Sequence, residues 1–230
     1  MNLPNTQQFY QQRSSGRGQW FFSLMSHRLY EIGLYRFVTT WLWQCPTALL
    51  LDHYRENMSV NHLEVGVGSG FFVRKTLQSI RGRRTEQRLV LVDLNARCLS
   101  KSAERLQAHA PEVQQQDLRE PMVLAGGAVQ SVGINYVLHC IKGSFSENRR
   151  LFAHLAAVLE DGGVLFGATL VTRPAREGRM AWLLMKTLNL VGIFNNDDQC
   201  LDELKQALEA SFAEVELTQA GNAVVFRAVR

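Results

Sequence analysis

An acidic residue followed by three evenly spaced glycines is the first stretch of this sequence whose residue types suggest chemistry. In HLEVGVGSGFF, Glu64 precedes the glycines Gly66, Gly68 and Gly70. Glycines allow unusual backbone dihedral angles and lack the Cβ atoms that would block a ligand. The GxGxG spacing differs from the GxGxxG of dinucleotide-binding loops, and no GKS or GKT follows as in a P-loop. The stretch therefore predicts a strand-to-helix turn that comes close to some other ligand.

The charge of Glu64 bears on the kind of ligand. A carboxylate just ahead of a phosphate site would repel the ligand, whereas it would attract a cationic ligand with an amino group. Two more carboxylates follow predicted strands: Asp93 ends LVLVD, and Asp117 lies in VQQQDLREP after what should be a short third strand. Open parallel sheets bind ligands at the carboxyl ends of their strands, which is where these acids lie. A strand-end Asp that only caps a helix is the structural alternative.

Alternating strands and helices are predicted to position these residues from about residue 61 onward. The predicted strands are HLEVGV, RLVLVDL, SVGINYVL, GGVLFGATLV, AEVELTQ and NAVVFRAVR, and the predicted helices include ARCLSKSAERLQAHA, SENRRLFAHLAAVLE and CLDELKQALEAS. Such alternation is typical of a mostly parallel sheet covered on both faces. The last two strands, joined by Gly-Asn, predict an antiparallel hairpin at the sheet edge. The aromatic-rich segment before residue 57 predicts helices separated by loops.

The ordered set of glycines and acids resembles motif I and the following strands of the class I S-adenosylmethionine-dependent methyltransferases. The resemblance covers about residues 61–230. It implies an α/β fold, with a Rossmann-like, doubly wound, mostly parallel seven-stranded sheet and a C-terminal antiparallel hairpin. We expect an N-terminal helical lid on the substrate side at residues 1–56 and a core that binds S-adenosylmethionine at residues 57–230.

The resemblance also implies roles for individual residues. Glu64 would serve the methionyl amino end of the cosubstrate, Asp93 the ribose hydroxyls and Asp117 the adenine amino group. Leu94 and Leu118 would flank the adenine ring. The full set expected to bind the cosubstrate is Glu64, Gly66, Val67, Gly68, Ser69, Gly70, Asp93, Leu94, Asn95, Asp117, Leu118 and Asn135.

The fourth predicted strand, SVGINYVLHC, would end beside both the cosubstrate and the methyl acceptor. An oxygen nucleophile needs its proton removed, and a histidine that titrates near neutrality suits that step, so His139 is the candidate catalytic base. A packed, hydrogen-bonded histidine at the strand end is an equally weighted alternative. The family often has Asp at the start of this strand, where this sequence has Ser131. This departure leaves open a methyltransferase-like protein that binds the cosubstrate without methyl transfer.

No metal ion is expected to take part in the reaction. Asp197 and Asp198 are adjacent, so their side chains point in different directions, and they precede a predicted helix that they are expected to cap. Cys140 is expected to be a buried strand residue. Methyl transfer from a sulfonium can proceed in line, helped by positioning and by the removal of water.

Aromatic residues before the glycine loop and after the fifth strand are candidates for the acceptor pocket. They are Tyr10, Trp20, Phe21, Tyr30, Tyr35, Trp41, Trp43, Trp182 and Phe194. For any one of them, packing of the N-terminal helices on the sheet is the alternative. Together they indicate a small, largely apolar or aromatic acceptor. The resemblance implies that this acceptor is methylated on oxygen, carbon or nitrogen, and analogy with the fold suggests the tailoring of a secondary metabolite.

Composition and charge bound the remaining properties. With 230 residues, 46% of them hydrophobic, the chain can bury a full core. No apolar stretch predicts a membrane span, the N-terminus lacks a secretory pattern and the four cysteines are scattered, so a cytoplasmic location is expected. The net charge of +4 and the run RGRR raise the alternative of RNA methylation, but solvated arginines are the favoured explanation. A basic face could also contact a membrane surface, and a dimer is a plausible oligomeric state.

Overall fold

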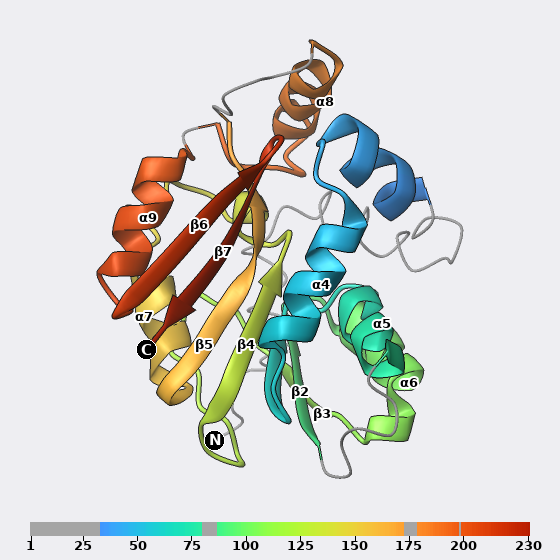
Figure 1. Cartoon of the computed structure of the whole chain (residues 1–230), viewed down its shortest axis with the longest axis vertical. Coiled ribbons are helices and arrows are strands. Elements are labelled where there is room, and N and C mark those ends of the chain that lie inside the picture. The colour runs from blue at the N-terminus through green and yellow to red at the C-terminus, as the bar shows by residue number, and fades with distance from the viewer. Residues whose placement is uncertain (1–32, 80–86, 173–178, 198) are drawn as a thin grey trace, which may run out of the picture.

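The strands form one mixed sheet in a computed structural model that describes residues 33–79, 87–172, 179–197 and 199–230. Seven strands lie in the order β3-β2-β1-β4-β5-β7-β6 (Figure 1). β7 pairs antiparallel with β5 and β6, and the other neighbouring strands pair parallel. The strands are β1 (Asn61–Val65), β2 (Arg88–Asp93), β3 (Glu112–Gln115), β4 (Val129–Asn135), β5 (Leu159–Leu170), β6 (Glu214–Ala220) and β7 (Ala223–Val229). The predicted seven-stranded sheet with its C-terminal hairpin is confirmed.

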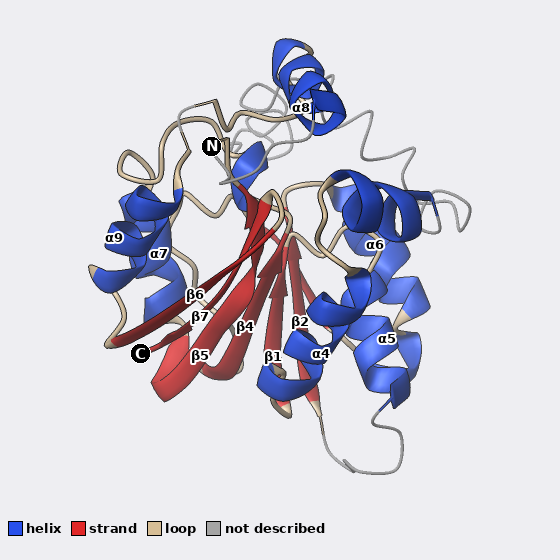
Figure 2. Cartoon of the chain, turned by 45° about the horizontal axis from the view of Figure 1, so that its top comes forward, coloured by secondary structure: helices blue, strands red, loops and turns tan. Residues whose placement is uncertain are grey.

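Helices cover both faces of the sheet, as Figure 2 shows. The helices and helical turns are η1 (Gly33–Leu42), α4 (Thr47–Asn57), α5 (Phe71–Ser79), α6 (Ala96–Arg105), η2 (Gln107–His109), η3 (Leu138–Cys140), α7 (Arg149–Ala157), α8 (Arg179–Leu190) and α9 (Leu201–Glu209). Leu63 of β1 packs in one core cluster with residues of α7 and α9, whereas Leu89 of β2 packs in a second cluster with residues of α4 and α5. Because strand side chains alternate between the two faces, the doubly wound arrangement is confirmed.

The helix that precedes the first strand is part of the core. Tyr54 of α4 is 1% exposed, stacks on Phe72 of α5 at 5.2 Å between ring centroids and meets Phe166 of β5 edge-on at 4.9 Å. α4 therefore belongs to the layer that covers the sheet. The lid boundary at residue 56 stays a prediction, and residues 1–32 of that segment lie outside the described residues.

The start of α9 differs from the expectation. Cys200 has an extended backbone (φ −123°, ψ 165°) and is the N-cap residue of this helix, with no side-chain capping bond. The exposed Asp197 lies too far before the first turn to reach its N–H groups, so its predicted capping role is wrong. Asp198 lies outside the described residues.

The described ranges contain neither a cluster of metal ligands nor a helix that could span a membrane. Within these ranges, no three His, Cys, Asp or Glu side chains converge in a way that could hold a metal ion. No helix in the same ranges is long and apolar enough to cross a bilayer. The expectation of a metal-independent reaction stays a prediction.

Candidate active site

The glycine loop joins the end of β1 to α5 with a backbone that glycine adopts readily. Gly66, Gly68 and Gly70 have φ angles of +64°, +52° and +71°, in the left-handed region. A Cβ atom on Gly66 would overlap the side chain of Val137, which follows β4. A Cβ atom on Gly68 would meet nothing closer than the Gly66 carbonyl oxygen, at 3.9 Å. The loop is therefore packed against protein at its first glycine and leaves room for a ligand at its second.

Asp93, at the end of β2, is bonded to the glycine loop. Its Oδ2 atom accepts a hydrogen bond from the Gly68 N–H group at 3.1 Å, and its Oδ1 atom accepts one from the Asn95 N–H group at 2.8 Å. Burial raises the pKa of the Asp93 carboxyl, while three backbone N–H groups act to lower it. Asn95 is the N-cap residue of α6, since its side-chain oxygen accepts the Arg97 N–H at 3.0 Å. The ends of β1 and β2 thus share one polar edge, and a cosubstrate role for Asn95 stays a prediction.

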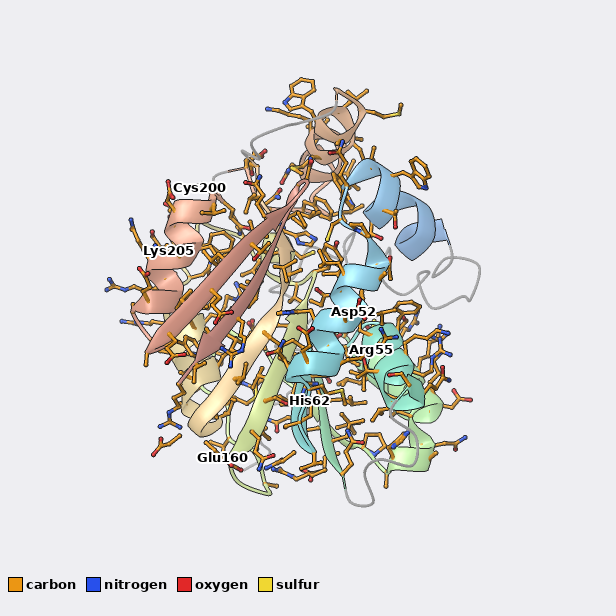
Figure 3. The ribbon with its side chains drawn as sticks, viewed as in Figure 1. Asp52, Arg55, His62, Glu160, Cys200 and Lys205 are labelled. Carbon is orange, nitrogen blue, oxygen red and sulfur yellow. The ribbon has the colours of Figure 1, made fainter. Side chains whose placement is uncertain are left out.

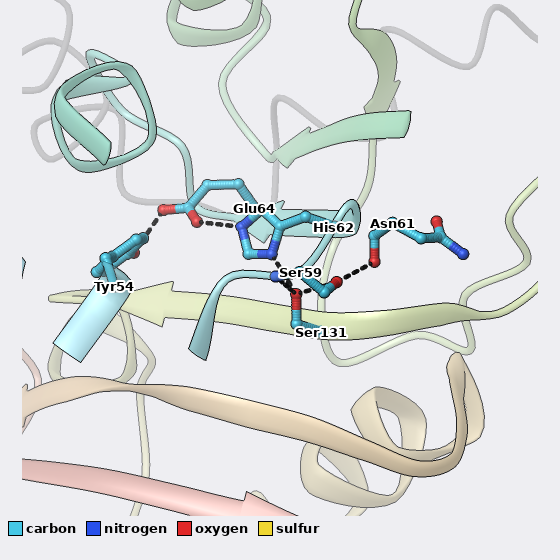
Figure 4. Close-up of polar contacts among 6 residues, drawn as sticks. All are labelled: Tyr54, Ser59, Asn61, His62, Glu64 and Ser131. Carbon is cyan, nitrogen blue, oxygen red and sulfur yellow. Dashed lines mark hydrogen bonds and ion pairs between the residues drawn. The ribbon is translucent and has the colours of Figure 1, made fainter. Parts of the chain in front are cut away.

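Glu64 lies in a buried polar network on the α4 side of β1 (Figure 4). Its Oε1 atom accepts a hydrogen bond from the Tyr54 hydroxyl at 2.8 Å, and its Oε2 atom lies 3.2 Å from Nε2 of His62. The other ring nitrogen of His62, Nδ1, lies 2.8 Å from Oγ of Ser131. Glu64 is 4% exposed and His62 is fully buried. The acid of the loop is therefore held from two sides before any ligand arrives.

Asp117 follows β3 and is held by a near neighbour in sequence. Its Oδ1 atom accepts a hydrogen bond from Nε of Arg119 at 3.0 Å, and its Oδ2 atom accepts one from Nη2 at 2.6 Å. Leu118 is partly buried against the core, and the carbonyl oxygen of Leu94 accepts a bond from the Gln115 side chain at 2.9 Å. These residues all lie at the carboxyl ends of β2 and β3, on the edge that the sequence predicts. Their contacts to adenine stay predictions.

The carboxyl end of β4 presents a buried polar side chain, that of Asn135. Asn135 is 8% exposed, and neither its Nδ2 nor its Oδ1 atom has a hydrogen-bond partner in the described part of the chain. It lies two residues before Val137, which packs on the glycine loop. Buried amides are nearly always hydrogen-bonded, so this one fits a ligand contact. The next residue, Tyr136, has a φ of +56°, a strained conformation of the kind that clusters at functional sites.

His139 is buried behind the end of β4, where Oγ1 of Thr169 lies 3.4 Å from its Nδ1 atom. It is 3% exposed, and its ring meets Phe194 edge-on at 4.5 Å between centroids. The Leu170 N–H group donates to its Nδ1 atom at 3.4 Å, so the proton of the neutral ring lies on Nε2. Burial lowers the pKa of His139 to about 3, which keeps the ring neutral at physiological pH. These contacts support the packed alternative, and the base role stays a prediction.

One of the predicted pocket residues, Phe194, packs against His139, and a second, Trp43, lies beside Phe194. Trp43 and Phe194 are buried, with ring centroids 6.1 Å apart. Trp182 of α8 is 49% exposed, and the Lys186 ammonium lies 5.8 Å from the centre of its ring. Trp41 is also exposed. The remaining candidates, Tyr10, Trp20, Phe21 and Tyr30, lie outside the described residues, as does the side chain of Tyr35.

Sequence reasoning missed the residues that hold the acids in place. His62 stands two positions before Glu64 in a strand, so the period of two could have placed both on one face. Arg119 follows Asp117 at the same spacing in a loop, where no periodicity applies. Tyr54 reaches Glu64 because α4 packs on the sheet, and no local sequence pattern predicts this contact.

Comparison with known proteins agrees with this geometry. A family described as a methyltransferase domain matches residues 63–167. Methyltransferase ctvB of Aspergillus terreus is 31% identical, with 96% of this chain and 97% of the relative covered. Demethylluteothin O-methyltransferase of Streptomyces thioluteus is 30% identical, with 92% and 90% covered. An O-methyltransferase family protein from Burkholderia thailandensis shares the fold, with a TM-score of 0.60 and 18% identity. The match covers 80% of this chain and 56% of the Burkholderia protein.

Fold, loop and relatives together define the class of the protein. The chain belongs to the class I S-adenosylmethionine-dependent methyltransferases. The enzyme class predicted from the sequence, a methyltransferase, is confirmed.

Proposed function

We propose that this methyltransferase transfers a methyl group from S-adenosylmethionine to a small, largely apolar or aromatic metabolite, as a tailoring step of secondary metabolism. The observation that carries the proposal is the juxtaposition of a polar edge, at the ends of β1 and β2, with the aromatic group His139, Phe194 and Trp43 beyond β4. The names of the relatives add support, since one acts on demethylluteothin and another belongs to a physcion biosynthesis cluster.

The residues present fit the proposed cosubstrate. Gly68 leaves space above the loop, Asp93 offers carboxylate oxygens at the end of β2, and the amide of Asn135 has no hydrogen-bond partner among the described residues. We assign the ribose hydroxyls to Asp93 and the ammonium group to Glu64, because a carboxylate is the natural acceptor for each. Val67 and Ser69 would contribute loop backbone, and Asp117, Leu94 and Leu118 would enclose the adenine.

The chain itself would act mainly by positioning. When bound, S-adenosylmethionine supplies a methyl group on a sulfonium that already carries its leaving group. Trp43 and Phe194 would hold the acceptor in line and exclude water, which accounts for much of the rate in such transfers. A base role for His139 would require the acceptor complex to free Nδ1 from the Leu170 N–H group. We propose that no metal ion takes part.

Methyl transfer from labelled S-adenosylmethionine to a metabolite extract tests the proposal. The intact chain should yield a labelled small molecule, and Asp93→Ala should yield little. The exposed surface variant Lys205→Ala, which removes only an ion pair with Glu209, is the matched control and should behave as the wild type. Label in RNA alone would favour the nucleic-acid alternative. Binding without any labelled product would favour a methyltransferase-like protein that does not transfer methyl groups.

Two further properties stay proposals from the sequence. We propose a cytoplasmic location, with a small-molecule acceptor as the only partner that the reaction requires. Sedimentation of the intact chain with and without anionic vesicles tests the expected dimer and the expected contact with a membrane surface.

A further inference from the structure

The pairing register of β1 and β4 places the residues of the network around Glu64. β1 and β4 pair so that His62 lies opposite Ser131 and Glu64 lies opposite Gly133. A Cβ atom on Gly133 would overlap Oε2 of Glu64 and lie 3.1 Å from Cε1 of His62. The glycine therefore leaves the space that the carboxylate and the imidazole occupy. Four positions on two strands act together to build this polar site.

The site is enclosed by the core. The His62 ring lies 5.8 Å from that of Phe166 between centroids, and α4 covers it from above. By contrast, Asp52 and Arg55 form an ion pair on the exposed side of α4, away from His62 (Figure 3). A buried carboxylate is strongly unfavourable unless it is hydrogen-bonded and its charge is balanced. The partners of Glu64 must therefore supply both.

The hydrogen bonds of the network determine where its protons lie. The Ser59 hydroxyl donates to the Asn61 carbonyl oxygen at 2.8 Å, so the 2.8 Å contact between the Ser59 and Ser131 hydroxyls uses the Ser131 proton. Oγ of Ser131 also accepts the Ser59 N–H at 2.9 Å and is then an acceptor toward His62. Nδ1 of His62 therefore carries a proton. The 3.2 Å contact between Nε2 of His62 and Oε2 of Glu64 is then a hydrogen bond only with one further proton between these two atoms.

We propose that His62 and Ser131 are positioning residues that hold the Glu64 carboxylate for the ammonium group of the cosubstrate, an inference that rests on the proposed function. Each Glu64 oxygen has one bond in the network and keeps a second acceptor site for a ligand. Ser131 stands where the family often has Asp. An acid there would bring a second carboxylate to His62, whereas a serine accepts the Nδ1 proton without adding charge.

Two ligands that differ at the ammonium end separate positioning from general damage. S-adenosylhomocysteine carries the ammonium group, and 5′-methylthioadenosine has the same nucleoside and thioether without it. Calorimetric titration of the intact chain should show that His62→Phe weakens S-adenosylhomocysteine binding about 10- to 100-fold, the range of a charge-assisted hydrogen bond. Binding of 5′-methylthioadenosine should change less than about twofold. Ser131→Ala, which removes only the hydroxyl group of this residue, should show the same selectivity at about three- to tenfold.

A matched control and a spectroscopic measurement complete the test. His53→Phe makes the same substitution on α4 at a histidine that bonds the Phe226 carbonyl outside the network, and it should leave the ratio of the two affinities unchanged. Nitrogen NMR should show a proton on Nδ1 of His62 and a shift of the ring signals with S-adenosylhomocysteine but not with 5′-methylthioadenosine.

The outcomes distinguish this inference from the proposed function. Equal loss of both ligands in His62→Phe and Ser131→Ala, no loss of either, or an unprotonated Nδ1 overturns the positioning role, while wild-type binding of S-adenosylhomocysteine leaves the proposed function standing. A wild type that binds neither ligand contradicts the proposed function and this inference with it.

Discussion

The two halves of the carboxyl edge of the sheet are built in different ways. At the ends of β1, β2 and β3, three acids are fixed by hydrogen bonds to backbone or neighbouring side chains, as with Asp93 and Gly68. Beyond β4, His139 packs between Phe194 and Tyr136, and side-chain amides such as those of Asn195 and Gln199 donate to backbone carbonyl oxygens nearby. The first half therefore presents carboxylates, whereas the second presents aromatic rings and amides that are bonded to backbone. We infer that the first half recognises a constant ligand and that the second accommodates an acceptor particular to this enzyme.

The largest effect on this contrast is expected from Gly66→Val. The valine would adopt a φ of +64° and overlap Val137, so S-adenosylhomocysteine affinity should fall more than about 100-fold in calorimetry. The double variant Gly66→Ala with Val137→Ala relieves the overlap but not the strain and should recover part of the binding. Wild-type affinity in Gly66→Val would mean that the loop does not carry the ligand.

Asp93→Ala should weaken S-adenosylhomocysteine binding about 10- to 100-fold, because the ribose hydroxyls lose a charged acceptor. Burial raises the pKa of this carboxyl, so wild-type affinity should also fall as the pH falls through that raised value and the carboxyl takes up a proton. Affinity measured against pH in the wild type and in Asp93→Asn provides the check. The same pH dependence in both proteins would assign it to another group.

His139→Gln tests how burial beyond β4 affects the stability of the protein. The ordinary histidine pKa of 6.5 applies to the unfolded chain and a pKa of about 3 to the folded one, so the unfolded chain binds more protons between these values. Stability is full above pH 6.5 and is lost as the pH falls toward 3, with a loss of about 2 kcal/mol between pH 7 and pH 5. Chemical unfolding at both pH values should show this loss in the wild type and a smaller one in the variant.

The same variant decides the chemical role of His139. Because a neutral ring with such a low pKa is a weak proton acceptor, turnover at saturating substrate should fall less than about tenfold. A larger loss, with the fold intact by circular dichroism, would restore the base role.

The smallest effect is expected from chelation. If positioning and removal of water carry the transfer, EDTA should leave turnover unchanged. Activity that disappears in EDTA and returns with a divalent ion would show that a metal ion takes part in the transfer.

The contrast between the halves also explains what the sequence could predict. The backbone conformation of the loop requires Gly66 and Gly68, and Asp93 marks the end of a strand, so all three have fixed spacings in the sequence. The loop and the order of the acids could therefore be predicted. The parallel sheet followed from alternating apolar runs. The partners Tyr54 and Ser131 meet Glu64 and His62 only through tertiary packing, and no spacing encodes such contacts.

The contacts beyond β4 are even harder to predict from the sequence. Trp43 and Phe194 lie far apart in the sequence and meet through loops that carry no periodicity. The low pKa of His139 results from its burial in the folded chain, which the sequence around it does not reveal. Residue type suggested a base, and burial argues for packing.

A crystal structure of the chain with S-adenosylhomocysteine tests the central claim most directly. The account predicts the ribose hydroxyls within hydrogen-bond distance of Asp93, the ammonium group on Glu64, and Asn135 bonded to the ligand. A ligand bound away from the glycine loop, or one at the loop that leaves both Glu64 and Asp93 untouched, would contradict it.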